Sequence, residues 1–252
     1  MITIIGTGHV FDIGQRIRLI IEARAPQAVC VELDPGRYYA LTHPDEAEKR
    51  KEKAPFFYRF LAGIQEQIAE QYGAPVGGEM IAAVEAARER LADVLLIDDN
   101  AGQVVQRMWK EMPFREKIRL FASAFGGMFA KKTTVEKELS DFQENPESFF
   151  SMLEKQMPTI KRILIDERNG HMAARVREAA QKYPNIVVIV GDGHVPGMSK
   201  LLEDLSPEII RLKELRAENF AIQSGVAGGA AGGAGKQSGD TGSATVSFYV
   251  EK

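Results

Sequence analysis

The sequence contains a single cysteine, Cys30, among its 252 residues, so it cannot form an intramolecular disulfide. Cys30 lies in the apolar run Ala28-Val29-Cys30-Val31, which favours a small buried residue over a reactive thiol. A chain without a disulfide framework is typical of a reducing compartment, so we expect a cytoplasmic protein.

The sequence also lacks an excess of one charge and a long hydrophobic run. Its 32 basic and 35 acidic residues are interspersed, so the overall charge does not call for nucleic acid or an anionic membrane as a partner. The nearest approach to a membrane segment, Phe121–Ala130, is much shorter than the roughly 18 apolar residues of a spanning helix. The N-terminus has no basic segment ahead of an apolar one. We therefore expect neither a transmembrane segment nor a signal peptide.

Short apolar runs alternate with helical patterns. Four runs rich in Val and Ile predict strands that are buried on both faces, as in a parallel sheet: Ile2–Ile5, Ala28–Val31, Val94–Ile97 and Ile186–Val190. Between them, apolar residues recur at helical spacing, first at Ile13, Ile17, Ile20 and Ile21 and later at Met80, Val84, Ala87 and Leu91. The alternation predicts an α/β fold with a central, mainly parallel sheet and helices on both sides.

Two further regions complete the organisation of the chain. Residues from about 100 to 183 have only helical patterns, with prolines at positions that fit first helical turns, and predict a helical insertion or cap between the third and fourth strands. We expect one domain over 1–215, followed by a Gly/Ala-rich linker within 216–252. Val246–Val250 is a strand sequence that would join an edge of this sheet or of a partner chain, giving a homo-oligomer in the second case. A disordered terminus is the alternative.

The strongest functional signal is a repeated local pattern. Gly6-Thr7-Gly8-His9-Val10 follows the first predicted strand, and Gly191-Asp192-Gly193-His194-Val195 follows the fourth. Glycine allows a sharp turn, and each histidine then stands at the carboxyl end of a strand, where open α/β sheets bind ligands. A dinucleotide-binding loop would need a third glycine, but Phe11 and Pro196 occupy those places. Helix capping is the alternative for both histidines.

Acidic residues follow the other two strands. Glu32 and Asp34 come after the second strand, and Asp98 and Asp99 after the third. Because parallel strands end at one edge of the sheet, a carboxylate from each pair should lie near the histidines. Carboxylate with imidazole forms either a ligand set for Zn, Mn or Co or a general-base pair. Helix capping and salt bridges are the alternatives.

Two predicted helices carry further candidates. Glu79 follows Gly77-Gly78 at a helix start, where the helix dipole favours a carboxylate with or without a chemical role. Glu167 and His171 continue an apolar helical stripe, which suggests a lined cavity; an exposed i, i+4 pair is the alternative. Arg168 could present a fixed cation to a carboxylate, a phosphate or a developing oxyanion.

Taken in order, these motifs resemble those of the TraB family. The resemblance rests on Gly6–Val10, Val31–Asp34 with Arg37, Gly78–Met80, Leu96–Asp98, Arg107–Trp109, Asp166–Asn169 and Gly191–Val195. That family includes pheromone-shutdown proteins and is related to Tiki metalloproteases and, more remotely, to erythromycin esterase and ChaN-like proteins. The resemblance implies an α/β fold and a Mn- or Co-dependent peptidase activity. Carried over by position, it selects His9, Glu32, Glu79, Arg168 and His194.

The leading hypothesis is a metal-dependent hydrolase of peptide or other amide bonds. His9, Glu32 and His194 would bind the ion, Glu79 or Glu167 would act as the base, and Arg168 would stabilise the oxyanion. One alternative is a metal-free hydrolase in which a histidine held by Glu32 is the general base. Another is a non-catalytic protein that binds a peptide or a small molecule. The sequence leaves the substrate, the ion and the oligomeric state open.

Overall fold

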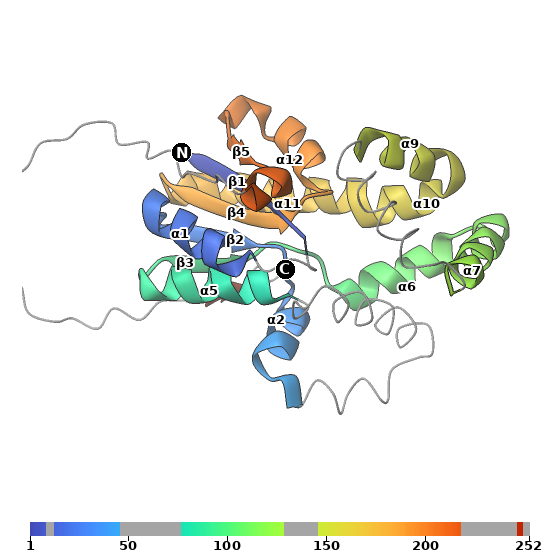
Figure 1. Ribbon diagram of the computed structural model, residues 1–252, viewed down its shortest axis with the longest axis horizontal. Coiled ribbons are helices and arrows are strands. Elements are labelled where there is room, and N and C mark those ends of the chain that lie inside the picture. Colours follow the sequence, from blue (N-terminus) through green and yellow to red (C-terminus); the bar gives the residue numbers. More distant parts are fainter. Residues whose placement is uncertain (9–12, 46–76, 129–145, 218–245, 249–252) are drawn as a thin grey trace, which may run out of the picture.

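A six-stranded sheet in which all neighbouring strands run parallel forms the centre of the protein. The computed structural model describes residues 1–8, 13–45, 77–128, 146–217 and 246–248 (Figure 1). In spatial order the strands are β5 (Glu208–Ile210), β1 (Ile2–Thr7), β4 (Ile186–Gly191), β2 (Ala28–Val31), β3 (Asp93–Leu96) and β6 (Val246–Phe248). The predicted parallel sheet is confirmed, and its four predicted strands are the central ones. The edge strand β5 was not predicted.

Successive side chains of the strands alternate between two apolar cores. On one face, residues such as Ile5 and Val31 pack with α1 (Gly14–Arg24), α5 (Gly78–Glu89) and α13 (Leu212–Arg216). On the other face, Ile4 and Cys30 pack with α11 (Glu167–Lys182) and α12 (Val195–Leu201). Helices therefore cover both faces, as the α/β prediction requires (Figure 1). Burial raises the pKa of the Cys30 thiol to about 12, which makes it a core residue and not a nucleophile.

The last residue of the apolar stripe predicted for α5 lies outside that helix. Met80, Val84 and Ala87 are buried, but Leu91 is 61% exposed and has a φ of +56°. The amide of Leu91 donates to Arg88 O and that of Ala92 to Ala87 O, which is the hydrogen-bond pattern of a Schellman helix end. Leu91 thus takes the left-handed position that usually holds glycine. The helix ends there because its last carbonyls are already satisfied.

Leu91→Gly is expected to raise the free energy of unfolding by about 1 kcal/mol, because a non-glycine residue in the left-handed region costs about 1–2 kcal/mol. Little burial is lost, since the Leu91 side chain is largely exposed. Urea denaturation of both proteins measures the difference. A lower midpoint in the variant would contradict this assignment of the helix end.

Between β3 and β4, all the described elements are helices. They are α6 (Ala101–Glu111), α7 (Phe114–Met128), α9 (Pro146–Gln156), α10 (Pro158–Lys161), the π-helical turn η1 (Arg162–Asp166) and α11. Val104, Met108, Met112 and Ile163 form a third, smaller core among them. In Figure 1, α6, α7, α9 and α10 extend beyond one end of the sheet. Pro146 and Pro158 are the first residues of α9 and α10, as expected from the spacing of the prolines.

The C-terminal strand pairs with the chain's own sheet. β6 lies parallel to β3, with Val246 opposite Val94 and Phe248 opposite Leu96. The sequence allowed this strand to join its own sheet or that of a partner chain, and the structure shows the first. The Gly/Ala-rich stretch before the strand lies outside the described residues. Within the described parts of the chain, no helix has the length and apolar character needed to cross a membrane.

Candidate functional site

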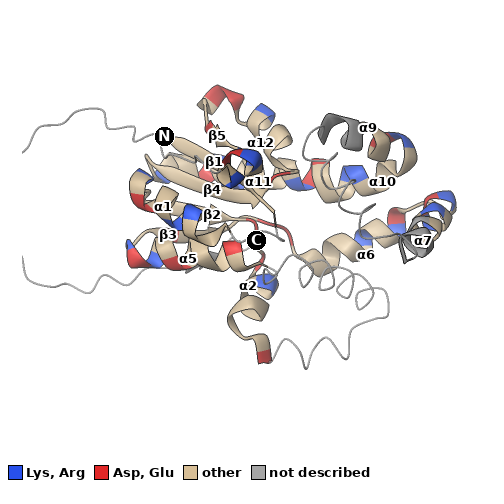
Figure 2. Cartoon of the chain, in the orientation of Figure 1, with Lys and Arg blue, Asp and Glu red and all other residues tan. Residues whose placement is uncertain are grey.

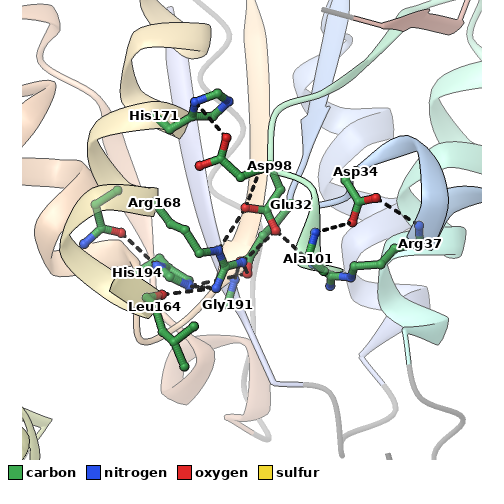
Figure 3. Close-up of polar contacts among 12 residues, drawn as sticks. Glu32, Asp34, Arg37, Asp98, Ala101, Leu164, Arg168, His171, Gly191 and His194 are labelled. Carbon is green, nitrogen blue, oxygen red and sulfur yellow. Dashed lines mark hydrogen bonds and ion pairs between the residues drawn. The ribbon is translucent and has the colours of Figure 1, made fainter. Parts of the chain in front are cut away.

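Polar side chains from separate segments meet at the carboxyl edge of the sheet (Figure 3). Glu32 follows β2, Asp98 lies two residues after β3, and His194 follows β4. Arg168, from the first turn of α11, reaches into the middle of them. The prediction that one carboxylate after each of β2 and β3 lies near the histidine after β4 is met by Glu32 and Asp98. We call these four side chains the edge cluster.

Glu32 is almost fully enclosed, with only 3% of the residue's surface exposed. Its Oε2 accepts the Gly191 amide at 2.6 Å, and its Oε1 accepts Nη2 of Arg168 at 2.5 Å. Burial alone would raise the pKa of Glu32, but the interactions with His194 and Arg168 and the Gly191 hydrogen bond outweigh it. They hold that pKa well below its usual value, so Glu32 is ionised at neutral pH.

Arg168 is fully engaged as a donor. Its Nε and Nη2 bind the two oxygens of Asp98 at 2.9 and 2.7 Å, and Nη2 also binds Glu32. Its Nη1 donates to Leu164 O and to His194 Nε2, both at 3.2 Å. All five N–H groups of the guanidinium therefore have acceptors. Burial opposes the charge, yet the two carboxylates raise the pKa of Arg168, which stays cationic.

Asp98 receives a second arginine from the opposite side. Nη1 of Arg37, in α2 (Pro35–Thr42), lies 2.9 Å from Asp98 Oδ2 (Figure 3). Asp34, the other acidic residue after β2, is the N-cap of α2 and accepts the Gly36 amide at 2.8 Å. The capping alternative is thus the observed one for Asp34. The cap also orients the helix that carries Arg37.

The orientation of His194 is fixed by an amide. The ring is buried, and its Nδ1 lies 2.8 Å from Oδ1 of Asn169. Because the amide oxygen only accepts, Nδ1 carries a proton, and in the neutral ring Nε2 presents a lone pair. That Nε2 lies 3.4 Å from Glu32 Oε1 and faces the guanidinium of Arg168. His194 is therefore oriented for binding a cation or accepting a proton.

The two glycine-rich turns lie side by side, because β1 and β4 are neighbours and Thr7 pairs with Gly191. A Cβ built on Gly6 would collide with the Asp192 carboxylate, which itself binds Arg211 and the Leu212 amide. A glycine is thus required at position 6, where the two turns pack together. A Cβ on Gly191 would make only ordinary contacts with Glu32 and His194, so the adjacency explains the glycine of the first motif alone.

The edge cluster has the donor types of a metal site. Two ligand atoms that share one ion at about 2.0–2.2 Å in tetrahedral geometry lie about 3.4 Å apart. Glu32 Oε1 and His194 Nε2 have that spacing. Among the described residues, no group of three His, Cys, Asp or Glu side chains could hold an ion. The third ligand that we predicted, His9, lies outside the described residues.

Comparison with known proteins agrees with the motif order. The model of the TraB/PrgY/gumN family matches residues 1–211, which include every member of the edge cluster. The chain belongs to this family. It is also 32% identical over 213 residues to the uncharacterized protein MJ1365 of Methanocaldococcus jannaschii. The match covers 81% of this chain and 54% of that protein, so the chain spans about half the length of this TraB relative.

The two predicted bases lie in different surroundings. Glu79 is 4% exposed in the first turn of α5, behind Gly77, whose φ is +77°. The end of α5 leads to the start of β3, so the first turn of α5 lies toward the opposite end of the strands. This is the carboxyl edge of the TraB sheet, where the edge cluster also lies. Glu167 is half-buried and forms ion pairs with Arg107 and Arg162. These arginines link it to Glu111 and not to the edge cluster. His171, predicted on the same face, pairs with Asp99 at 3.0 Å.

Asn169 was quoted in a motif but given no role by the sequence analysis. A signal was present, because Asn169 precedes Met172, Ala173 and Val176 at helical spacing and all four are buried. A polar residue on a buried stripe needs a hydrogen-bond partner, which here is His194. Its amide nitrogen also lies where a Cβ on Gly197 would be. No comparable signal marked the contact of Arg37 with Asp98.

Proposed function

We propose that this TraB-family chain is a metal-dependent hydrolase of peptide or other amide bonds. His9, Glu32 and His194 would hold the ion, which would be Mn or Co by family resemblance, with Zn suited to the same donor types. The observation that supports this most is the 3.4 Å separation of His194 Nε2 from ionised Glu32 Oε1. When bound, such an ion polarises the scissile carbonyl and lowers the pKa of a bound water.

Arg168 has two tasks in this proposal. Its contacts with Asp98 and Glu32 neutralise two buried carboxylates and fix their positions. Four of its N–H groups are committed to Asp98, Glu32 and the Leu164 carbonyl. The fifth, on Nη1, donates to His194 Nε2. Once the Nε2 lone pair binds an ion or a proton, this N–H group can instead donate a hydrogen bond to a substrate oxygen. It would then stabilise the negative charge that develops on that oxygen.

The proposal assigns the base to Glu79 in preference to Glu167. Glu79→Gln is expected to lower the hydrolysis rate by about 10²–10⁴-fold, as the loss of a general base does. Glu167→Gln is the matched control and should stay within about twofold, because two surface arginines hold that carboxylate. Initial rates on one peptide substrate measure both variants. A large loss confined to the Glu167 variant would reverse the assignment.

The function is tested with protein purified without chelator and assayed against a peptide library. Cleavage should be lost after treatment with EDTA and restored by added Mn or Co. Cleavage that survives complete removal of the ion would favour a second candidate, a metal-free hydrolase in which His194 is the base. The cationic group that already lies between Glu32 and His194 is the observation in favour of that candidate. Absence of cleavage under all conditions would leave non-catalytic binding of a peptide or a small molecule as the remaining function.

A further inference from the structure

One face of α7 is apolar and exposed. Phe114, Ile118 and Phe121 are 76%, 53% and 56% exposed, respectively. Their spacing of four and three residues places them on a single face of the helix. We call these three side chains the α7 stripe. Isolated exposed apolar residues are common, but three aligned on one helix mark an interaction surface.

The opposite face of α7 is attached to the rest of the helical insertion. Glu116 is buried and accepts the amide and the hydroxyl of Thr159 at 3.1 and 2.9 Å, at the start of α10. Leu120 packs against the small core of the insertion, and Arg119 donates to the Gln156 carbonyl. Because these contacts fix the rotation of α7, Phe114 and Ile118 face away from the packed helices, and Phe121 lies beside Trp109 of α6.

Positive charge borders the stripe. At 100° per residue, Arg115 lies on one side of Phe114 and Ile118 and Lys117 lies on the other. The neighbouring acidic residues are neutralised or buried: Glu111 pairs with Arg162, and Glu116 faces Thr159. The charge that the described part of α7 presents to solvent is therefore positive, although the whole chain has a net charge of −3 (Figure 2).

We infer that α7 docks on an anionic lipid surface, with the stripe in the interface and Arg115 and Lys117 at the level of the headgroups. An apolar helical face bordered by basic residues is the pattern of helices that lie in the plane of a membrane. A second copy of the chain is a poorer occupant, because the basic borders of two stripes would repel each other. The inference is independent of the proposed hydrolysis.

The chain carries its own reporter for this contact. Trp109 is its single tryptophan. The Trp109 ring lies edge-on to Phe121, with centroids 6.0 Å apart, and Lys117 Nζ is 5.0 Å from its centroid. Burial of the stripe in lipid should therefore shift the Trp109 emission to shorter wavelength.

The test mixes the full chain with vesicles of phosphatidylcholine, with or without roughly one-third phosphatidylglycerol. A blue shift and co-sedimentation are expected with the anionic vesicles only, and both should weaken as salt is added. Phe114→Ser with Ile118→Ser should reduce binding by about tenfold or more, since each removes exposed apolar area. Arg115→Gln and Lys117→Gln should each reduce it by about fivefold.

Leu19→Ser is the matched control, because Leu19 is also half exposed but lies on α1. It should bind anionic vesicles as the parent does, and thermal melts should show that every variant is folded. Absence of vesicle binding by the parent would overturn the inference. It would also be overturned by a concentration-dependent dimer that forms without lipid and disappears in the Phe114→Ser/Ile118→Ser variant.

Discussion

Arg168→Met is expected to lower the free energy of unfolding by about 3–5 kcal/mol, the usual cost of removing one partner from a buried ion pair. The Arg168 side chain is only 15% exposed, and its guanidinium binds two carboxylates that are themselves buried, Glu32 and Asp98. Without it, both would be left in the interior with one positive neighbour fewer. Arg168→Lys should recover only part of the loss, because an ammonium cannot reproduce the bidentate contact with Asp98. Urea denaturation at neutral pH measures both variants.

The loss should depend on pH in a defined direction. In the parent, the pKa of Glu32 is held well below 4.5, so its ionised form stabilises the native state at all pH values above the pKa of the unfolded chain. This contribution disappears as the pH falls through the lowered native value. In Arg168→Met, Glu32 has lost one of the cations that lower its pKa, so its carboxylate takes up a proton more readily. The difference in stability between parent and variant should therefore be largest near neutral pH and shrink in acid.

Arg162→Met is the matched control for this prediction. Arg162 lies six residues before Arg168 and also pairs with two carboxylates, but it does so at the surface. Its removal should change the melting temperature little, because exposed ion pairs are screened by solvent. Equal effects of the two substitutions would contradict the role given to the edge cluster.

His194→Ala is expected to reduce hydrolysis by about 10²–10⁴-fold while the protein still folds. The substitution removes the Nε2 lone pair beside Glu32 and leaves Asn169 Oδ1 without its buried donor. The second effect should cost about 1–3 kcal/mol of stability. Added Mn or Co should raise the melting temperature of the parent by mass action on the native state, and the variant should lose most of this response.

His171→Ala provides the control for His194→Ala. His171 also pairs with an aspartate from the end of β3, but its partner is Asp99 and its ring is not part of the edge cluster. Activity and the thermal response to Mn should stay close to those of the parent. Unchanged hydrolysis in the His194 variant would contradict both the metal-dependent and the metal-free mechanism.

The sheet was predictable from the sequence because its central strands are buried on both faces. Such strands consist of unbroken Val and Ile runs, as in Ile186–Val190, and their shared direction brings Glu32, Asp98 and His194 to one edge. β5 escaped detection since it has only three residues, all half-buried. A strand that short carries no recognisable pattern.

The resemblance selected Arg168 for the site, but helical periodicity could not predict that Arg168 and not Glu167 faces inward. The apolar stripe of Ile160, Ile163 and Leu164 continues in a regular α-helix to position 167, which predicts that Glu167 faces inward. The π-helical turn η1 contains one residue more than a regular α-helical turn. The residues that face inward after it are therefore shifted by one position toward the C-terminus. The inward face thus carries Arg168 and Asn169, and Glu167 turns to the surface arginines. Nothing in the sequence marked the extra residue.

The central claim is that Glu32 and His194 hold one divalent ion, and anomalous diffraction from a Mn-loaded crystal tests it most directly. The account predicts a peak at about 2.0–2.3 Å from both Glu32 Oε1 and His194 Nε2. The Nη1 of Arg168 should have withdrawn from its 3.2 Å contact with the imidazole. A crystal of active protein that shows no peak at this edge of the sheet, with Arg168 still bound to His194 Nε2, would contradict the account.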